Sequence, residues 1–454
     1  MKARDVKTAE DAAALIRERG LTHVKVGIVD LDGIYRGKLI SREKFLSSMK
    51  KGFGFCDVVF GWDNNDQLYP DNDLTGWRTA FPDATAVIDP ASCRDVPGEN
   101  GMVMFMASFL GEAGELCPRA LLNRIIARGE AMGLTARVAA EFEFFVFEET
   151  AHSVREKDYK GLTNLTPGFF GYSMLRASTQ SALYDDILAM AAELDAPIEG
   201  LHTETGPGVL EAAIEHAPTM EAADRAVLFK LFMKVLAQRQ GKMATFMARW
   251  SNDWPGQSGH LHFSLADQDG PVFFDPDAPH TMSQKMRWFM GGLQTLAPEI
   301  LAMTAHTVNS YSRLVPGFWA PTDATWGVEN RTCALRVIQG SAASQRVEVR
   351  LAAADINPHL AIASWLGAGL YGIEHQIEPD APIEGNAYAI DHAPERQLPR
   401  TLTDAANRLE ASAAAADLFG PFFTKHYAMS RRWEDQEFRR SITDWELKRY
   451  FEII

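Results

Sequence analysis

Two glutamates one residue apart, Glu141 and Glu143, lie inside an apolar and aromatic run from Val138 to Phe147. Such β-favouring residues predict a buried strand, and alternate side chains of a strand share one face. Both carboxylates then point into one compartment, where burial is costly unless a cation or a proton compensates for their charge. The alternative is an edge strand whose glutamate face meets water. Phe145 would lie on that same face, where an apolar side chain is not expected.

Two further predicted strands repeat this alternation of polar and apolar residues. One carries two histidines on one face, and the other carries two arginines and a glutamate: His260 and His262, and Arg346, Glu348 and Arg350. The segment Gly206-Pro207-Gly208 favours a tight turn that brings Glu204 and Glu211 near one another. Three separate solvated strands would show the same pattern, whereas one lined cavity accounts for all of these groups together.

The chemistry of these groups points to metal ions and phosphate. Carboxylates with one imidazole form a hard ligand set that suits Mg²⁺ or Mn²⁺, whereas zinc more often brings cysteine or several histidines. Arginine forks bind phosphate and carboxylate oxygens in pairs, so the sequence predicts metal-bridged phosphate chemistry. No GxxxxGK[ST] loop occurs, and the GxGxxG match at 367–372 lies within an apolar helical run and does not follow a strand.

Composition narrows the possible functions. The chain has 454 residues, of which 46% are apolar, enough for a large core and more than one domain. A net charge of -15 without a basic run argues against binding to nucleic acid or to an anionic membrane surface. The four cysteines are scattered and form no CxxC pair, which fits a reducing cytoplasm. The charged N-terminus is no signal peptide, and the uncharged run 360–373 is too short to span a bilayer and predicts a buried helix.

The order of elements predicts a small β-rich module followed by a larger unit. Thr8 caps a short helix, and the turn Asp32-Gly33 joins two strands. A polar, tryptophan-containing stretch follows between residues 52 and 97, and its role is open. We place the boundary near Gly111 to Cys117, before a helix that Pro118 opens. The remaining expectations are a loop at 152–170, a helix at 178–194, a strand at 242–248 and a mostly helical C-terminal part from residue 357.

Seven segments of the chain stand in a characteristic order. They are Glu141-Phe142-Glu143-Phe144-Phe145, His202-Thr203-Glu204 through Glu211, 241–247, Ser258-Gly259-His260-Leu261-His262, 309–317, Asn330-Arg331 through Arg336, and Arg346-Val347-Glu348-Val349-Arg350. Together they resemble the glutamine synthetase family over nearly the whole chain. The resemblance implies an α+β fold with an N-terminal β-grasp domain, 1–112. It also implies a glutamine synthetase/guanido kinase-like catalytic domain, 113–454, with an open antiparallel, barrel-like cavity flanked by helices.

The resemblance also implies the reaction and the site. The family uses ATP to phosphorylate the γ-carboxylate of glutamate, and an amine then displaces phosphate, with two or three Mg²⁺ or Mn²⁺ ions per site. One metal would be held by Glu143, Glu211 and Glu348, and the other by Glu141, Glu204 and His260. The implied substrate contacts are Arg313, Arg350 and Gly256 for glutamate, Arg331, Arg336 and Arg346 for phosphate, and His262 for the nucleotide.

The resemblance implies a homo-oligomer as well. In this family an aspartate from the neighbouring subunit's N-terminal module helps to deprotonate the incoming amine, and Asp63 is the match here, with Asp66 as the alternative. The site would then lie between subunits of a ring, and a dodecamer of two stacked hexamers is the usual form.

Three positions depart from glutamine synthetases proper. In those enzymes a flap that follows the Val-Pro-Gly motif carries a glutamate, which helps to take a proton from ammonium. Here the flap reads Phe318-Trp319-Ala320-Pro321, and Trp319 stands in place of the glutamate. A tryptophan can instead pack an organic amine or meet its cation face-on. The other reading is that Trp319 packs elsewhere in the flap. Val209 replaces a common glutamine, and Pro255 replaces a glutamate-binding asparagine before Gly256.

The leading hypothesis is an ATP-dependent ligase that joins a small organic amine to the γ-carboxylate of glutamate, similar to the γ-glutamylpolyamine and γ-glutamylmethylamide synthetases. It would open amine catabolism in the cytoplasm. Three alternatives stay open: glutamine synthesis from ammonia, a catalytically silent structural or regulatory relative, and an acid substrate other than glutamate. The complete set of implied metal ligands argues against the silent relative, because buried polar groups without partners cost stability.

Overall fold

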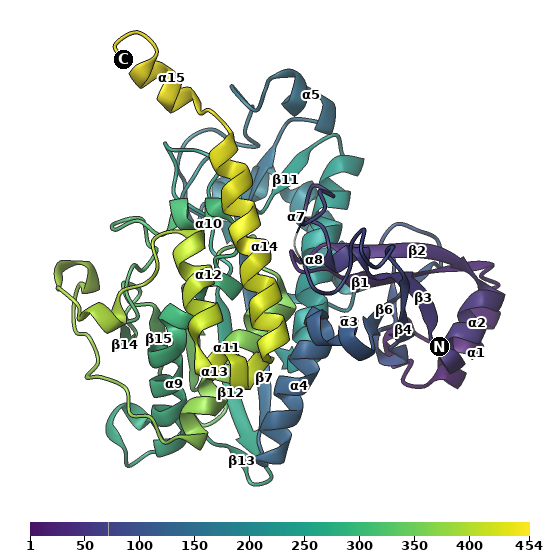
Figure 1. The fold of residues 1–454 in the computed structure, drawn as a ribbon, viewed down its shortest axis with the longest axis horizontal. Coiled ribbons are helices and arrows are strands. Elements are labelled where there is room, and N and C mark those ends of the chain that lie inside the picture. Colours follow the sequence, from purple (N-terminus) through teal and green to yellow (C-terminus); the bar gives the residue numbers. More distant parts are fainter. Residues whose placement is uncertain (71) are drawn as a thin grey trace.

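Two β-sheets organise the chain, and the computed structural model describes residues 1–70 and 72–454. The strands of the first sheet are β1 (His23–Val29), β2 (Tyr35–Ser41), β3 (Phe53–Cys56), β4 (Asp83–Ile88), β5 (Arg94–Asp95) and β6 (Val103–Phe109). Their order is β2-β1-β6-β4-β3, with β5 paired to β6 (Figure 1). Only β1 and β6 run parallel among these pairs of the described chain.

Two helices accompany this sheet, α1 (Ala9–Glu18) and α2 (Arg42–Lys51). The predicted cap at Thr8 is confirmed: its hydroxyl accepts from the Asp11 amide, and the Asp11 carboxylate accepts from the Thr8 amide. The predicted turn at Asp32-Gly33 also joins β1 to β2. This N-terminal part forms the purple module in Figure 1.

The second sheet carries ten strands and is mostly antiparallel. They are β7 (Thr135–Phe147), β8 (Ile198–Thr203), β9 (Val209–Ile214), β10 (Ala217–Pro218), β11 (Met243–Thr245), β12 (Leu261–Asp267), β13 (Gly270–Pro271), β14 (Trp326–Val328), β15 (Leu335–Ile338) and β16 (Arg346–Val349). The main order is β14-β15-β16-β12-β7-β9-β8, and the parallel pair β14 and β15 makes the sheet mixed.

The predicted strand around Glu141 is confirmed as β7, which lies at the centre of this sheet. Its apolar face packs on α8 (Thr219–Arg239), where Phe142 and Phe144 meet Phe229. Glu141 and Glu143, which alternate with these phenylalanines, face the other way. The period of two along β7 therefore directs the phenylalanines into the core and the glutamates to the opposite face of the sheet. The fold is therefore α+β, as expected.

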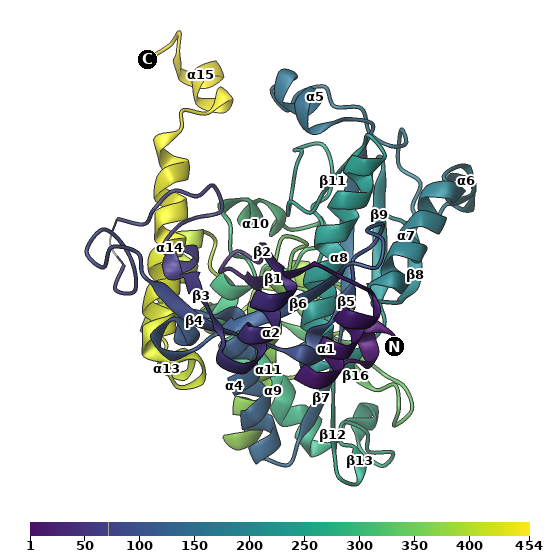
Figure 2. The same ribbon diagram turned by 90° about the vertical axis from the view of Figure 1, so that its right-hand side faces the viewer.

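Helices cover the second sheet and continue to the C-terminus (Figures 1 and 2). They are α3 (Gly111–Leu116), α4 (Pro118–Ala131), α5 (Ala151–Glu156), α6 (Met174–Thr179), α7 (Ser181–Glu193), α9 (Gln284–Ile300), α10 (Val308–Arg313), α11 (Pro358–Glu374), α12 (Leu402–Ala411), α13 (Ala413–Phe419), α14 (Pro421–Arg440) and α15 (Asp444–Tyr450). No helix in residues 1–70 and 72–454 combines the length and apolar character that a membrane crossing requires.

The apolar run at 360–373 is the buried helix α11, as predicted. Its GxGxxG match serves helix packing: a Cβ on Gly369 would lie 2.0 Å from the Phe289 ring, and one on Gly372 would lie 2.2 Å from the Trp288 carbonyl oxygen. Two expectations were wrong in detail. The stretch 152–170 begins inside α5 instead of being wholly a loop, and the strand expected at 242–248 is only the short β11.

The tip of the β1–β2 hairpin inserts into the second unit. Asn357 at the start of α11 donates to the Asp30 carbonyl oxygen at 2.8 Å, and Arg431 of α14 forms an ion pair with Asp32 at 2.7 Å. Gly33 has φ +79°, and a Cβ there would lie 2.9 Å from the Asn357 Cα. The junction therefore requires glycine at this position.

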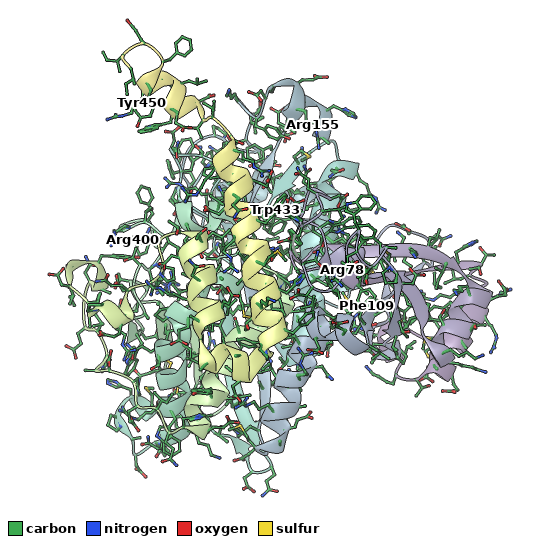
Figure 3. The ribbon with its side chains drawn as sticks, viewed as in Figure 1. Arg78, Phe109, Arg155, Arg400, Trp433 and Tyr450 are labelled. Atoms are coloured by element: carbon green, nitrogen blue, oxygen red, sulfur yellow. The ribbon has the colours of Figure 1, made fainter. Side chains whose placement is uncertain are left out.

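The C-terminal arm, residues 441–454, extends beyond the end of α14 and away from the body in both ribbon views, and Figure 3 marks Tyr450 on it. None of the residues of α15 is buried. Large apolar side chains are exposed along the arm: Ile442, Trp445, Leu447, Tyr450, Phe451, Ile453 and Ile454.

Candidate active site

A cavity of about 460 Å³ lies over the polar face of the second sheet. Most of the site residues predicted from the sequence line it: Glu141, Glu143, Glu204, Glu211, Gly256, His260, His262, Trp319, Arg331, Arg336, Arg346, Glu348 and Arg350. The two predicted residues outside its lining are Arg313 and Asp63. The separate polar-faced strands of the sequence therefore share one compartment.

Strand register explains why these groups meet. Glu143 of β7 lies opposite Glu211 of β9, and His262 of β12 lies opposite Glu348 of β16. β12 also pairs with β7, which sets the histidines beside Glu141. Because side chains alternate along each strand, one correct register aims all of these groups at the same side.

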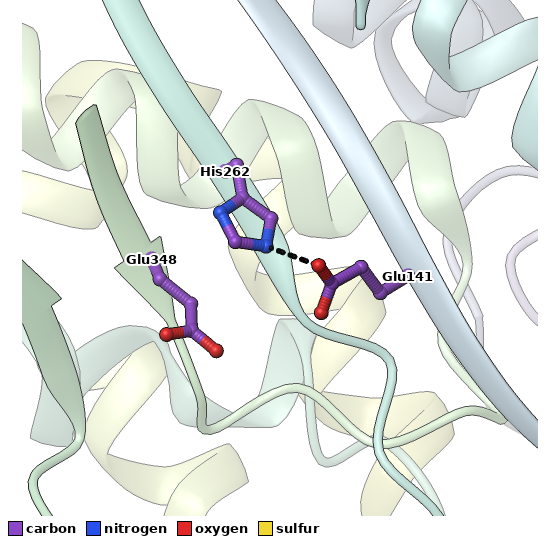
Figure 4. A group of neighbouring side chains, drawn as sticks. All are labelled: Glu141, His262 and Glu348. Carbon is purple, nitrogen blue, oxygen red and sulfur yellow. Dashed lines mark ion pairs between the residues drawn. The ribbon is translucent and has the colours of Figure 1, made fainter. Parts of the chain in front are cut away.

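The first acidic group contains Glu141 and Glu348 with the two histidines. Nε2 of His262 lies 3.0 Å from a Glu141 oxygen, and Nδ1 of His260 lies 3.3 Å from a Glu348 oxygen and 3.6 Å from Glu141. Figure 4 shows Glu141, His262 and Glu348 pointing into one space from three strands. Burial alone would raise the pKa of Glu141, but His262 and His260 outweigh it and hold that pKa well below its usual range.

The second acidic group contains Glu143, Glu204 and Glu211. Burial, and next the charge of Glu211, raise the pKa of Glu143 to about 7. His202 joins this group, with Nε2 at 3.3 Å from a Glu211 oxygen, and that hydrogen bond raises the pKa of His202. The turn at 206–208 thus brings Glu204 and Glu211 together, as expected.

Both groups fit a divalent cation. Single donor atoms of Glu141, His262 and Glu348 lie within 4.8 Å of one another, and so do those of His202, Glu204 and Glu211. The structure thus divides the acids differently from the expected pairs, because Glu348 stands with Glu141 and Glu204 stands with Glu211. Nε2 of His260 is buried without a hydrogen-bond partner in the described chain. Oxygen-rich donors with imidazole suit Mg²⁺ or Mn²⁺, and a cation would relieve the repulsion that Glu143 experiences.

Arginines stand beside the acidic groups. Arg350 and Arg336 contact Glu348 at 2.6 and 3.0 Å. Burial would raise the pKa of Glu348, but His260 and Arg350 lower it to about 2, so this carboxylate stays charged. Nη1 of Arg346 donates to the Ser344 carbonyl oxygen, and Arg331 opens to the cavity. These guanidinium groups give the cavity a cationic side next to its acidic groups.

Arg313 lies directly beneath the cavity floor. It is 2% exposed, and its guanidinium donates to the carbonyl oxygens of Leu351 and Arg350, both at 3.2 Å. Within residues 1–70 and 72–454 no carboxylate forms an ion pair with it, and burial lowers its pKa to about 10. Gly256 packs on this side chain, since a Cβ there would lie 2.6 Å from the Arg313 Cγ. A buried cation without a carboxylate partner is costly, so an anion bound beside it would be stabilising.

The flap residue Trp319 lines the cavity and is 59% exposed, with φ +59°. This left-handed backbone conformation is uncommon for a bulky residue and is found at functional sites. Its neighbour Phe318 lies over the Arg249 guanidinium at 5.3 Å. Arg249 also donates to the carbonyl oxygens of Ser251, Asn252 and Ser312, so it anchors the flap to α10.

Asp63 lies in the N-terminal module and is buried. Its carboxylate accepts from the amides of Asn65 and Gln67 at 2.9 Å and from the Trp433 indole at 3.1 Å. Asp66 pairs with Arg36 at 2.8 Å. Neither aspartate lines the cavity of its own chain.

Sequence reasoning missed three residues near the cavity. His202 shares a strand face with Glu204, and that spacing of two could have revealed it. Tyr172 lines the cavity and packs against His202, with ring centroids 4.5 Å apart and ring planes tilted by 33°, but it lies in an unpatterned segment. The flap anchor Arg249 also had no sequence signal.

Comparison with known proteins agrees with this geometry. The family model "Glutamine synthetase, catalytic domain" matches residues 115–450. The chain belongs to the glutamine synthetase family. A type-1 glutamine synthetase of Dictyostelium discoideum is 42% identical over 95% of this chain and 84% of its own. A glutamate–isopropylamine ligase of a Pseudomonas species is 34% identical over 97% of both chains.

Solved structures in this family share the whole fold. A structure named GmaS/ADP complex superposes with a TM-score of 0.84 at 27% identity, covering 97% of this chain and 99% of that one. As a glutamine synthetase family member, the chain is an ATP-dependent glutamate–amine ligase. The named relatives use different nitrogen donors, so the amine is the open part of the reaction.

Proposed function

We propose that this protein ligates a small organic amine, rather than ammonia, to the γ-carboxylate of glutamate. The observation that carries the proposal is Trp319, which lines the cavity at the flap position where glutamine synthetases proper have an acid. Without that acid the pocket lacks a group that holds ammonium and takes its proton. An exposed indole instead offers an apolar face for a carbon chain and a π face for its ammonium. The resemblance to a glutamate–isopropylamine ligase supports this choice.

The family resemblance assigns the arginines to the two substrates. Arg313 and Arg350 bind the carboxylates of glutamate, and Arg331, Arg336 and Arg346 bind the phosphates of ATP, with His262 on the nucleotide side. A γ-carboxylate oxygen attacks the terminal phosphorus, and the bond to the bridging oxygen breaks to release ADP. The amine nitrogen then attacks the acyl carbon of γ-glutamyl phosphate and loses a proton, and phosphate leaves with the C–O electron pair. The guanidinium groups neutralise charge on the transferring phosphoryl group.

The metal ligands would be Glu141, His260 and Glu348 in one group, and Glu143, Glu204 and Glu211 in the other. Two or three Mg²⁺ or Mn²⁺ ions bound there would screen the charge of the triphosphate and of the transferring phosphoryl group. The protein's own part is to hold these carboxylates together on one sheet, on β7, β9 and β16 and just after the end of β8.

The amine is deprotonated with help from Asp63 of a neighbouring subunit. Asp63 does not line its own cavity, and the exposed apolar arm 441–454 offers a surface for another copy. We therefore propose a homo-oligomeric ring, a dodecamer in the family's usual form, with sites between subunits. The two sheets share no strand among the described residues, which supports a β-grasp domain at 1–112 and a catalytic domain at 113–454.

The cellular role is the first step of amine catabolism, in which the amine nitrogen is masked as a γ-glutamylamide. The need for ATP and the four free cysteines suit the reducing cytoplasm.

The test is phosphate release from ATP with Mg²⁺ and glutamate, comparing ammonium with a panel of organic amines and using Glu211→Ala as the inactive control. Turnover with an organic amine and little with ammonium supports the proposal. Turnover with ammonium alone would instead make this a glutamine synthetase, the second candidate that the 42% identical relative favours.

A further inference from the structure

Three departures from glutamine synthetases proper converge in the structure. Val209, Pro255 and Trp319 come from separate parts of the chain, yet all three line the same cavity. Each places an apolar side chain where those enzymes have a polar one. Independent replacements of one kind around one space indicate that this part of the cavity receives an apolar group.

The strand register shows how the apolar wall begins. Phe145 lies opposite Val209, two residues beyond Glu143 and Glu211 along the same strands and therefore on the same face. Two residues of a strand span about 6.8 Å, so the apolar pair follows directly on the acidic one. Phe145 and Val209 belong to a small hydrophobic cluster that is separate from the main core and also contains Phe147.

Aromatic side chains continue this wall to the mouth of the cavity. We call Tyr172, Phe318 and Trp319, which line the cavity, together with Trp254 beside Pro255, the aromatic collar. Tyr172 packs against His202, and Phe318 lies over Arg249. Trp254 meets Phe169 at 5.1 Å. Among the described residues Trp319 forms no aromatic or cation–π pair, and it is 59% exposed, so a ligand can reach its indole.

The charges of the cavity limit what the substituent can be. Every carboxylate that lines it belongs to one of the two acidic groups: Glu141, Glu143, Glu204, Glu211 and Glu348. The collar itself adds no carboxylate within the part of the chain that the structure describes. The proposed function assigns Asp63 of the neighbouring subunit to the reacting nitrogen. A second ammonium on the amine would therefore lose its water without gaining an anionic partner from the cavity lining, which is unfavourable.

We propose that the amine is a primary monoamine whose substituent is an uncharged alkyl or aryl group, held between the aromatic collar and the Phe145–Val209 wall. The inference rests on the proposed function and narrows it, because it excludes diamines and polyamines. Each methylene buried on this wall strengthens binding by about fourfold. The KM for the amine therefore falls along a series from methylamine to n-butylamine.

The test compares n-butylamine with 1,4-diaminobutane, which have the same chain length and differ in the terminal charge. We expect kcat/KM for n-butylamine to be at least about tenfold higher. Trp319→Ala is expected to raise the KM for n-butylamine about tenfold while leaving the KM values for ATP and glutamate unchanged. Trp319→Glu is expected to shift the preference towards 1,4-diaminobutane. Tyr159→Ala, which truncates an exposed aromatic residue outside the cavity, is the matched control and keeps the wild-type preference.

The outcomes separate the two proposals. Equal or better use of 1,4-diaminobutane by the wild-type enzyme overturns this inference and leaves the proposed function intact. Turnover with ammonium and with no organic amine overturns both. An unchanged KM for n-butylamine in the Trp319→Ala enzyme would contradict the proposed role of the aromatic collar, even if the wild-type enzyme prefers monoamines.

Discussion

Replacing Gly256 with alanine tests how tightly the cavity floor holds Arg313. The added Cβ would lie 2.6 Å from the Arg313 Cγ, 2.9 Å from its Cβ and 2.7 Å from the Ala248 carbonyl oxygen. These are not flexible side-chain ends: the contacts on Arg313 are close to its backbone, and the Ala248 oxygen is fixed by the Gln257 amide at 2.7 Å. The arginine must therefore move.

The size of the effect follows from the cost of overpacking, about 1 to 3 kcal/mol. The added methyl group would displace Arg313 from its hydrogen bonds to the Leu351 and Arg350 carbonyl oxygens. Returning the guanidinium to the position proposed to bind glutamate would then cost this free energy. Since about 1.4 kcal/mol is a factor of ten, the KM for glutamate should rise by about 5-fold to 140-fold. The KM for ATP should change little, because Gly256 is a contact of the glutamate-binding side.

The assay is phosphate release at saturating ATP and amine with glutamate varied, together with thermal unfolding of each variant. Gly200→Ala is the matched control, because a Cβ there meets nothing nearer than the Ala213 Cβ at 4.0 Å. A folded Gly256→Ala enzyme whose KM for glutamate stays within twofold of wild type would refute this account of the floor.

Three further changes have defined outcomes. Glu211→Gln should raise the melting temperature of the metal-free protein, because Glu211 repels the buried Glu143. It should also reduce the stabilisation by Mn²⁺, because it removes one ligand of the second acidic group. A thermal scan with and without Mn²⁺ checks both, and an unchanged Mn²⁺ shift would contradict the assignment. Burial lowers the pKa of His426 to about 4, below its unfolded value near 6.5, so the imidazole is neutral in the folded state and stability is lost as pH falls from about 6.5 towards 4. Urea unfolding at pH 7.5 and 5 should show a loss of about 2 kcal/mol that His426→Gln does not show. Deleting residues 441–454 should reduce the assembly to smaller species in light scattering, because the deleted arm is exposed and apolar; an unchanged mass would remove the arm from the interface.

The cavity-lining strands could be predicted because their signal is local. The alternation at Glu141 and Glu143, at His260 and His262, and around Glu348 is a period of two that survives in the folded sheet. Helix α11 was equally predictable, from the uncharged apolar run at 360–373.

Other features depend on packing between distant segments. Which glutamate belongs to which acidic group depends on the order of the strands in the sheet. No spacing along the chain could therefore place Glu348 beside Glu141. Tyr172 reaches the cavity only because its segment folds over His202. Arg249 anchors the flap through hydrogen bonds to backbone carbonyl oxygens. Every residue has such an oxygen, so the sequence does not indicate these partners.

The inserted hairpin tip makes the N-terminal module inseparable from the rest of the chain. Removing it would leave the Arg431 guanidinium buried without Asp32 and the side-chain amide of Asn357 without the Asp30 and Leu31 carbonyl oxygens. An orphaned buried charge of this kind costs about 3 to 5 kcal/mol, a large part of the stability of most proteins. Exchanging this module between relatives would therefore also require exchange of the parts of α11 and α14 that contact the hairpin tip. We expect the module and these helices to have evolved together.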